Sequence, residues 1–595
     1  MSELIEGFPD TALGRLFTGA HPPADVTWFS LPGGRTLYAA GDPAETLYFV
    51  RAGRLGAVRR EEGHEQQFLG VIKSGEPAGE MALIAGTPHT ATVMALRDSE
   101  IMALPRAAFF AAARRHPEIM AELARLMIVR ARHSGGRNPA GNPTVFGFVG
   151  VSDGLEVRAF VEQVEREVAA IGRTAAVVGS EALQAPTEWF TVVEQRHDFV
   201  LYVAEPGEAA WTELCGRQVD RLFLVGKGDA PPPGKPSDFA AEAIRTHRLM
   251  DLILVHDRPG RPTGSAAWLD AAPAARLFHV RSGDRADAAR IARVITATSV
   301  GLVLSGGGAR AYAHIGAIRA LREAGTPIDF VGGASMGAII AAGVALGWDD
   351  AEIDRRIRKG FVESSPLADI ALPIIAMTRG LNVAERLRQN FDDVEIADLW
   401  LPYFCVSSNL TTGAYELHKR GPLRNALRAS IALPGILPPV IEGDNVLVDG
   451  AVMRNFPADV MRIWHSGPIV GVDVSVSRGL TAKDMKLPGS LWSWLLSGDW
   501  RKGPPIVSLL MRAATVSTQR DLIAAHEVTD LLIAPKLEGV EIRDWKAYEP
   551  AVEAGYKATV AALEKLDRPV TELRHPDGEH GELGHGLTLA VAAPG

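Results

Sequence analysis

Two glycine-rich stretches contain the residues whose types and spacing could do chemistry. Residues 333–337 read Gly-Ala-Ser-Met-Gly, which fits the G-x-S-x-G turn that presents a serine nucleophile between a strand and a helix. Ser335 is therefore the candidate nucleophile of an acyl hydrolase. The second stretch ends in Ala309 and Arg310, and its successive glycines could direct backbone N–H groups at an oxyanion. The candidate oxyanion donors are Gly306, Gly307, Gly308 and Met336.

A serine hydroxyl needs a base before it can act as a nucleophile. Asp449 follows a short apolar run, so it ends a predicted strand from which its carboxylate could reach the Oγ of Ser335. Taken alone, an Asp-Gly pair is more typical of an ordinary turn. The alternative is a Ser–Asp–His triad with His465 or His526 as the base, although neither histidine lies in a recognisable motif.

A second G-x-S-x-G match at residues 150–154 serves as an internal control. It also follows an apolar strand, but no glycine loop precedes it. We expect Ser152 or Asp153 to cap the helix that follows. Because so short a motif arises by chance in a glycine-rich chain, the glycine loop and Asp449 are what favour Ser335.

Alternating apolar and helical segments predict the elements that position these residues. Residues 300–304 and 328–332 predict buried parallel strands, joined by a helix from Ala311 to about Ala324. The glycine loop then follows the first strand, and Ser335 follows the second. His314 falls on the connecting helix, where a packed helical histidine is the expected structure.

The 595 residues predict several domains. Near the N-terminus, residues 46–50 and 55–58 predict a hairpin, and residues 106–132 predict a helix. The expected fold is multidomain, with 1–132 as a β-barrel domain, 133–143 as a linker, 144–298 as an α/β linker domain, 299–566 as an α/β hydrolase domain and 567–595 as a disordered tail. The middle domain carries no Gly-Lys-Ser/Thr, so nucleoside triphosphate binding is not predicted.

Composition limits the function classes. A net charge of −9 argues against a broad nucleic-acid-binding face. The two cysteines, Cys215 and Cys405, are far apart, which excludes a zinc-like spacing and fits a reducing, cytoplasmic compartment. No signal peptide or membrane-spanning run is recognisable, so we expect any membrane contact to be peripheral. No metal or cofactor is predicted.

Gly-Gly-Gly-x-Arg, G-x-S-x-G and Asp-Gly-Ala, in this order, resemble the patatin-like phospholipase family and its neuropathy-target-esterase subgroup. Residues 309–316, 397–404 and 429–435 agree with that subgroup. The resemblance implies an α/β patatin-like hydrolase in which a Ser–Asp dyad, without histidine or cofactor, cleaves phospholipids or lysophospholipids through an acyl-enzyme. The family usually has glycine where Ala311 stands. The supporting motif residues are Arg310, Gly333, Gly337 and Gly450.

Residues 78–83 and 88–93 resemble the phosphate-binding cassette of cyclic-nucleotide-binding domains. In that family a glutamate binds the ribose hydroxyl and an arginine binds the cyclic phosphate. Glu80 matches, but His89 stands at the arginine position and cannot offer a fork of donors. We therefore expect residues 1–132 to have the fold of a cyclic-nucleotide-binding domain, but His89 makes nucleotide binding doubtful. A cyclic-nucleotide sensor, or a scaffold with a relic hydrolase site, is the alternative to an enzyme.

Two features have competing interpretations. Arg310 could hold the glycine loop, bind an anionic head group or form a structural salt bridge. Residues 491–502, which are rich in tryptophan and flanked by basic residues, suit a bilayer interface or a lid over an acyl groove. The alternative for that stretch is tryptophan packed in the core of its own domain.

Overall fold

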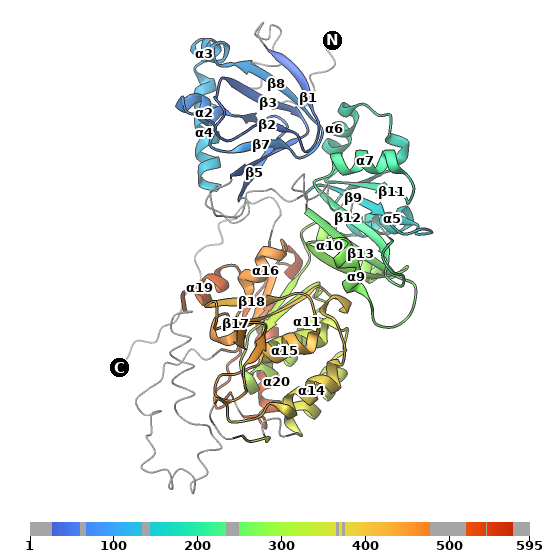
Figure 1. Ribbon diagram of the computed structural model, residues 1–595, viewed down its shortest axis with the longest axis vertical. Coiled ribbons are helices and arrows are strands. Elements are labelled where there is room, and N and C mark those ends of the chain that lie inside the picture. Colours follow the sequence, from blue (N-terminus) through green and yellow to red (C-terminus); the bar gives the residue numbers. More distant parts are fainter. Residues whose placement is uncertain are drawn as a thin grey trace, which may run out of the picture.

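The computed structural model describes residues 26–59, 67–133, 143–233, 249–364, 368–371, 375–475, 519–542 and 544–574. Figure 1 shows three regions that follow one another along the longest axis, with the N-terminal region in blue, the middle region in green and the third in yellow to orange. The tryptophan-rich stretch at 491–502, most of the predicted linker and most of the predicted tail lie outside the described residues.

The N-terminal region packs antiparallel strands in two sheets, with one helix between β6 and β7 and two helices after the last strand. One sheet has the order β1 (Thr27–Leu31), β8 (Ser99–Pro105), β3 (Thr46–Ala52) and β6 (Pro77–Ala78). The other has the order β2 (Thr36–Tyr38), β7 (Thr92–Ala95), β4 (Arg54–Arg59) and β5 (Gln67–Lys73). The helices are α2 (Glu80–Ala85), α3 (Arg106–Arg115) and α4 (Glu118–His133).

Two predictions for this region are wrong in detail. The expected hairpin does not form, because β3 pairs with β8 and β6 whereas β4 pairs with β5 and β7. Gly53 turns the chain from one sheet to the other at φ 93°, where a Cβ would lie 2.3 Å from the Oγ of Ser99. The single helix expected from Arg106 is interrupted before Pro117, because proline disfavours helical conformation in the residue before it.

The middle region is a parallel sheet with helices between its strands, which confirms the predicted α/β pattern. The strand order is β10 (Ala175–Val178), β11 (Phe199–Ala204), β9 (Val145–Gly150), β12 (Arg221–Lys227), β13 (Leu249–His256) and β14 (Arg276–Arg281). Its helices include α5 (Val157–Ala170), α6 (Thr187–Arg196), α7 (Ala209–Gln218), α9 (Ser265–Ala271) and α10 (Arg285–Ile295).

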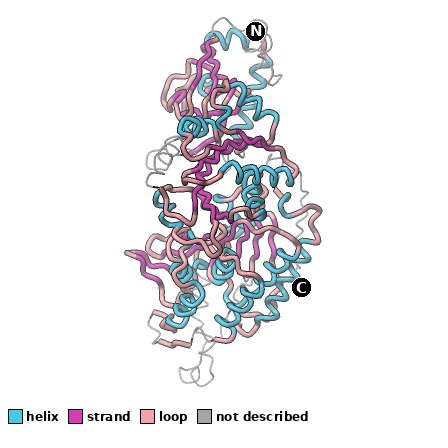
Figure 2. The backbone as a smooth tube through the Cα atoms, turned by 90° about the vertical axis from the view of Figure 1, so that its right-hand side faces the viewer, coloured by secondary structure: helices cyan, strands magenta, loops and turns pink. Residues whose placement is uncertain are grey.

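The third region has a mixed sheet surrounded by helices, which Figure 2 shows from the side. The strand order is β19 (Val440–Glu442), β20 (Asn445–Asp449), β17 (Tyr403–Asn409), β16 (Phe330–Ala334), β15 (Gly301–Leu304), β21 (Ile469–Val472) and β22 (Leu531–Ile533), and β18 (Ala414–His418) also pairs with β17. Among its helices are α11 (Ala313–Glu323), α12 (Met336–Ala345), α14 (Leu381–Phe391), α15 (Leu423–Ser430), α16 (Ala458–Trp464), α19 (Gln519–Glu527) and α20 (Tyr548–Leu563).

Buried or partly buried groups join the middle region to each of its two neighbours. Between the N-terminal and middle regions, Arg97 pairs with Glu194 at 2.6 Å. Between the middle and third regions, Nε2 of His279 lies 2.7 Å from the carbonyl oxygen of Ala397. One hydrophobic cluster also crosses this second boundary, because it includes Phe278 of β14 and residues of β15, β16 and β17. The middle and third regions therefore share part of their core.

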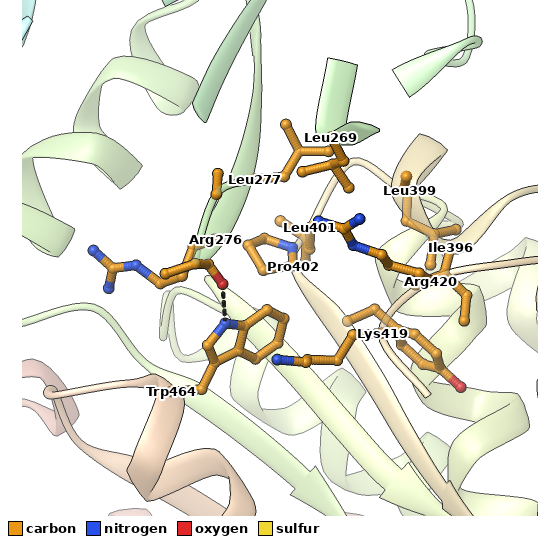
Figure 3. A pocket seen from close by; sticks show the side chains of 14 residues that line it. Leu269, Arg276, Leu277, Ile396, Leu399, Leu401, Pro402, Lys419, Arg420 and Trp464 are labelled. Atoms are coloured by element: carbon orange, nitrogen blue, oxygen red, sulfur yellow. Dashed lines mark hydrogen bonds between the residues drawn. The ribbon is translucent and has the colours of Figure 1, made fainter. Parts of the chain in front are cut away.

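Figure 3 shows a small crevice at the boundary between the middle and third regions. Its accessible volume is about 60 Å³, and Trp464 crosses it to donate an indole N–H to the carbonyl of Ala275 at 3.0 Å. Tyr403, at the start of β17, belongs to its lining. Neither Ser335 nor Asp449 lines this crevice, so it is not part of the candidate active site.

Candidate active site

The strand register brings Ser335 and Asp449 together from distant parts of the chain. β16 runs parallel to β17 and ends at Ala334, which pairs with Val406. β20 runs antiparallel to β17 and ends at Asp449, which pairs with the next residue, Ser407. Because β18 occupies the other edge of β17, β16 and β20 meet end to end along one edge. The Oγ of Ser335 donates a hydrogen bond of 2.7 Å to the Oδ2 of Asp449.

Ser335 occupies a strained turn between β16 and α12. Its φ of 51° and ψ of −129° lie outside the regions that side-chain-bearing residues prefer. The flanking glycines allow this turn to pack against the end of β15. A Cβ on Gly333 would lie 2.7 Å from the carbonyl oxygen of Leu304, and one on Gly337 would lie 2.4 Å from that of Ser305. Only glycine fits these two positions.

Asp449 is a buried carboxyl group whose pKa is higher than usual. Burial raises its pKa to about 7, although hydrogen bonds from Ser335 and from the N–H of Ala451 act in the opposite direction. The Ala451 N–H lies 2.8 Å from Oδ1. Near neutral pH the carboxyl can therefore both accept and return a proton, as a general base must.

The glycine loop follows β15 and faces the nucleophile. The N–H of Gly306 donates to the carbonyl oxygen of Asn455 at 3.1 Å, and the Nδ2 of Asn455 donates back to the carbonyl of Gly306 at 3.3 Å. Gly306 is therefore not a free donor, unlike the expectation from the sequence. The N–H groups of Gly307, Gly308 and Met336 make no hydrogen bond to another described residue.

Arg310 and His314 both hold the backbone around the loop. The guanidinium of Arg310 donates to the carbonyl oxygens of Val474, Leu537 and Val540 at 2.9, 3.0 and 2.9 Å. Of the three interpretations of Arg310, loop support is the one for which the described contacts provide evidence. His314 is fully buried in α11, as expected, and its Nε2 lies 2.8 Å from the carbonyl oxygen of Ser305. Burial lowers its pKa to about 4, so the ring is neutral.

The alternative bases are engaged elsewhere. His465 follows α16 and lies beside the N-terminal end of β15, at the end of the strands opposite Ser335, where its Nε2 is 2.7 Å from the carbonyl oxygen of Ser299. Nε2 of His526 is 2.9 Å from a carboxylate oxygen of Asp473. The hydroxyl of Ser335 instead donates to Asp449. The described geometry therefore favours a dyad over a triad.

The control motif in the middle region has a structural role. The Oγ of Ser152 accepts a hydrogen bond of 3.0 Å from the N–H of Lys227. The expected helix cap is wrong, because α5 begins at Val157 and its first N–H groups donate to the carboxylate of Glu205 at 3.1 and 2.8 Å. That carboxylate occupies the helix N-terminus where a phosphate would bind in a nucleotide-binding loop.

The sequence analysis missed two residues beside the site. Asn455 holds the glycine loop, and Ser430 accepts a hydrogen bond from the N–H of Ser335 at 3.0 Å. Both partners are distant in sequence, so spacing gave no signal, although residues 429–435 matched the subgroup pattern. Among the described residues no group of three or more His, Cys, Asp or Glu side chains could hold a metal ion.

The candidate nucleotide site of the N-terminal region is filled by an aromatic pair. His89 is buried, and its ring stacks on Tyr38 with centroids 3.7 Å apart. Burial lowers the pKa of His89, so the ring is neutral near pH 7. Glu80 is buried at the start of α2. The arrangement supplies neither a guanidinium fork nor open space beside Gly79, where a Cβ would lie 3.1 Å from the His89 ring.

We therefore expect calorimetric titration with cAMP or cGMP to give no saturable heat. The expected unfolding midpoint is unchanged by either nucleotide, because a ligand that does not bind the native state cannot stabilise it. A saturable isotherm with either nucleotide would show that Tyr38 moves aside and that His89 suffices at the arginine position.

Comparisons with known proteins agree with this division of the chain. Residues 302–462 match the patatin-like phospholipase family, residues 144–302 the neuropathy target esterase family P-loop like domain, and residues 28–116 the cyclic nucleotide-binding domain. The chain thus combines a patatin-like phospholipase domain with a cyclic-nucleotide-binding fold and an α/β domain between them. No helix among the described residues has the length and apolar character needed to span a membrane.

The relatives identify the family. An uncharacterised NTE family protein of Mycobacterium bovis is 32% identical over 90% of this chain and 91% of its own length. Patatin-like phospholipase domain-containing protein 6 of Mus musculus is 28% identical over 93% of this chain, which spans about half (46%) of that relative. The Catabolite Activator Protein of Thermus thermophilus aligns at 26% identity and a TM-score of 0.19, over 26% of this chain and 68% of its own. The chain belongs to the neuropathy target esterase (NTE) family.

Proposed function

We propose that the protein is a serine hydrolase that cleaves fatty-acyl esters of glycerophospholipids or lysophospholipids. The observation that carries this proposal is the 2.7 Å hydrogen bond between the hydroxyl of Ser335 and the carboxylate of Asp449. Support for a lipid ester comes from the match of residues 302–462 to patatin-like phospholipases. The related Mus musculus protein carries the same description in its name.

Asp449 takes the proton from the Oγ of Ser335 as that oxygen attacks the ester carbonyl. The carbonyl oxygen gains negative charge, which is stabilised by the N–H groups of Gly307, Gly308 and Met336, the donors that no other described residue engages. When the tetrahedral intermediate collapses, the glycerol oxygen leaves with the proton from Asp449, and the fatty acyl group stays on Ser335.

A water molecule then completes the cycle. Asp449 takes a proton from this water as the water attacks the acyl carbonyl, and the same donors stabilise the second oxyanion. The bond to Ser335 breaks, the Oγ recovers the proton from Asp449, and the fatty acid departs. The pKa of Asp449, raised by burial to about 7, suits a group that accepts and returns a proton twice in each turnover. Because phospholipid substrates reside in membranes, the protein contacts the membrane surface peripherally to reach them.

Fatty-acid release tests the proposal directly. We expect the wild-type protein to release fatty acid from lysophosphatidylcholine, phosphatidylcholine or a short-chain phenyl ester, and to be labelled by a fluorophosphonate. Ser335→Ala should abolish both signals. Ser152→Ala is the matched control, because it removes the serine of the other G-x-S-x-G stretch and should keep both activities. No release and no labelling by folded wild-type protein would overturn the proposal in favour of a scaffold. Activity in Ser335→Ala would identify a different nucleophile.

A further inference from the structure

Ser430 lies beside the nucleophile and makes two hydrogen bonds that no step of the proposed reaction uses. Its side chain is fully buried at the end of α15. Its Oγ accepts the N–H of Ser335 at 3.0 Å and donates its own proton to the carbonyl oxygen of Val406 at 2.7 Å. The hydroxyl therefore joins the turn after β16 to the middle of β17.

The hydrogen bond to the N–H of Ser335 stabilises a backbone conformation of Ser335 that is unfavourable by itself. A non-glycine residue at φ 51° and ψ −129° is strained, and this conformation persists only where the surroundings determine it. In this conformation the N–H of Ser335 points to the Oγ of Ser430. Without an acceptor there, the buried N–H would be left without a hydrogen bond, which further destabilises this conformation.

The same short segment also holds the base. The N–H of Asp449 donates to the carbonyl oxygen of Ala432 at 2.9 Å, two residues beyond Ser430. Residues 430–432 thus contact the backbone of both partners of the dyad. The segment is itself fixed, because α15 buries Leu423 and Leu427 in the core of the third region.

We propose that Ser430 is a positioning residue that holds the Ser335 turn at the rotation from which the Oγ faces Asp449. This inference rests on the proposed function. Ser430 touches neither substrate nor the reacting atoms in this scheme, and it acts through the backbone of Ser335. Loss of the Ser430 hydroxyl should therefore lower the rate at which the Oγ of Ser335 attacks the ester, and it should not change the affinity for lipid.

Ser430→Ala should lower kcat about 10–100-fold and leave KM within about threefold, because the lost alignment affects the transition state. The rate of fluorophosphonate labelling should fall by a similar factor. The midpoint of the pH–rate profile should also move to higher pH. The hydrogen bond from Ser335 lowers the pKa of Asp449, so a displaced Oγ lets that pKa rise. Ser430→Thr retains the hydroxyl and should recover most of the lost kcat.

Ser299→Ala is the matched control. Its Oγ is also buried and hydrogen-bonded, to Nε2 of His465 at 3.0 Å, but it lies at the opposite end of the strands. The Ser299→Ala variant should lose about as much stability as Ser430→Ala, but its kcat and the midpoint of its pH–rate profile should equal those of the wild type. If Ser430→Ala behaves like Ser299→Ala in an active protein, the positioning role is wrong and the proposed function stands. If wild-type protein hydrolyses no ester, the proposed function fails, and the role of Ser430 fails with it.

Discussion

Replacing Asp449 by asparagine should lower kcat for ester hydrolysis by about four orders of magnitude, the loss typical when a serine hydrolase cannot use its base. An amide cannot take the proton of Ser335, yet it has nearly the shape of the carboxyl, so the protein should stay folded. For the wild-type protein, kcat should rise with pH through about 7, because only the ionised carboxylate is a base. Stopped assays of fatty-acid release between about pH 5 and 9 measure both effects.

Asp444→Asn is the control for this experiment. Asp444 is exposed in the turn between β19 and β20, the hairpin whose second strand ends at Asp449. Its replacement should change neither kcat nor the pH midpoint. If Asp449→Asn keeps a tenth or more of the wild-type rate, another group takes the proton from Ser335 and the dyad is wrong.

The elements nearest the nucleophile could be predicted because their signals are local. The expected strand, glycine loop and helix correspond to β15, the loop at residues 306–308 and α11. The G-x-S-x-G stretch predicted the turn at Ser335, because glycine is needed where the turn packs against the end of β15. These features leave their signal in a few consecutive residues, so the sequence pattern alone was enough to predict them.

The contacts that complete the site could not be predicted, because they join distant segments. Ser335 and Asp449 are 114 residues apart, and their approach depends on the register of β16 and β20 along β17. Gly306 was expected to be an oxyanion donor, but its N–H is taken by Asn455, which lies nearly 150 residues later (a separation of 149). The wrong hairpin at Gly53 has the same cause, since strand pairing follows the packing of the two sheets and not the turn alone.

Asp449, the proposed catalytic base, should also lower the free energy of unfolding when its carboxyl group is ionised. Burial raises the pKa of Asp449 from the usual 3.8 to about 7, so the folded protein binds a proton more strongly than the unfolded chain does. Between about pH 4 and 7 the unfolded chain releases this proton first, and the free energy of unfolding falls as pH rises. Above about pH 7 both states are ionised, and the full cost, roughly 4 kcal/mol, is present.

Asp449→Asn should therefore be more stable than the wild type at pH 8, by up to roughly 4 kcal/mol, although it is inactive. The difference should shrink as pH falls through about 7 and vanish near pH 4, because the protonated carboxyl, like the amide, is neutral. Urea unfolding of both proteins at several pH values measures this difference. An equal gap at pH 5 and pH 8, or a less stable variant at pH 8, would show that Asp449 does not titrate near neutrality. If the difference in the free energy of unfolding depends on pH and Asp449→Asn has lost turnover, then the buried carboxyl of Asp449 is the catalytic base and also destabilises the folded protein.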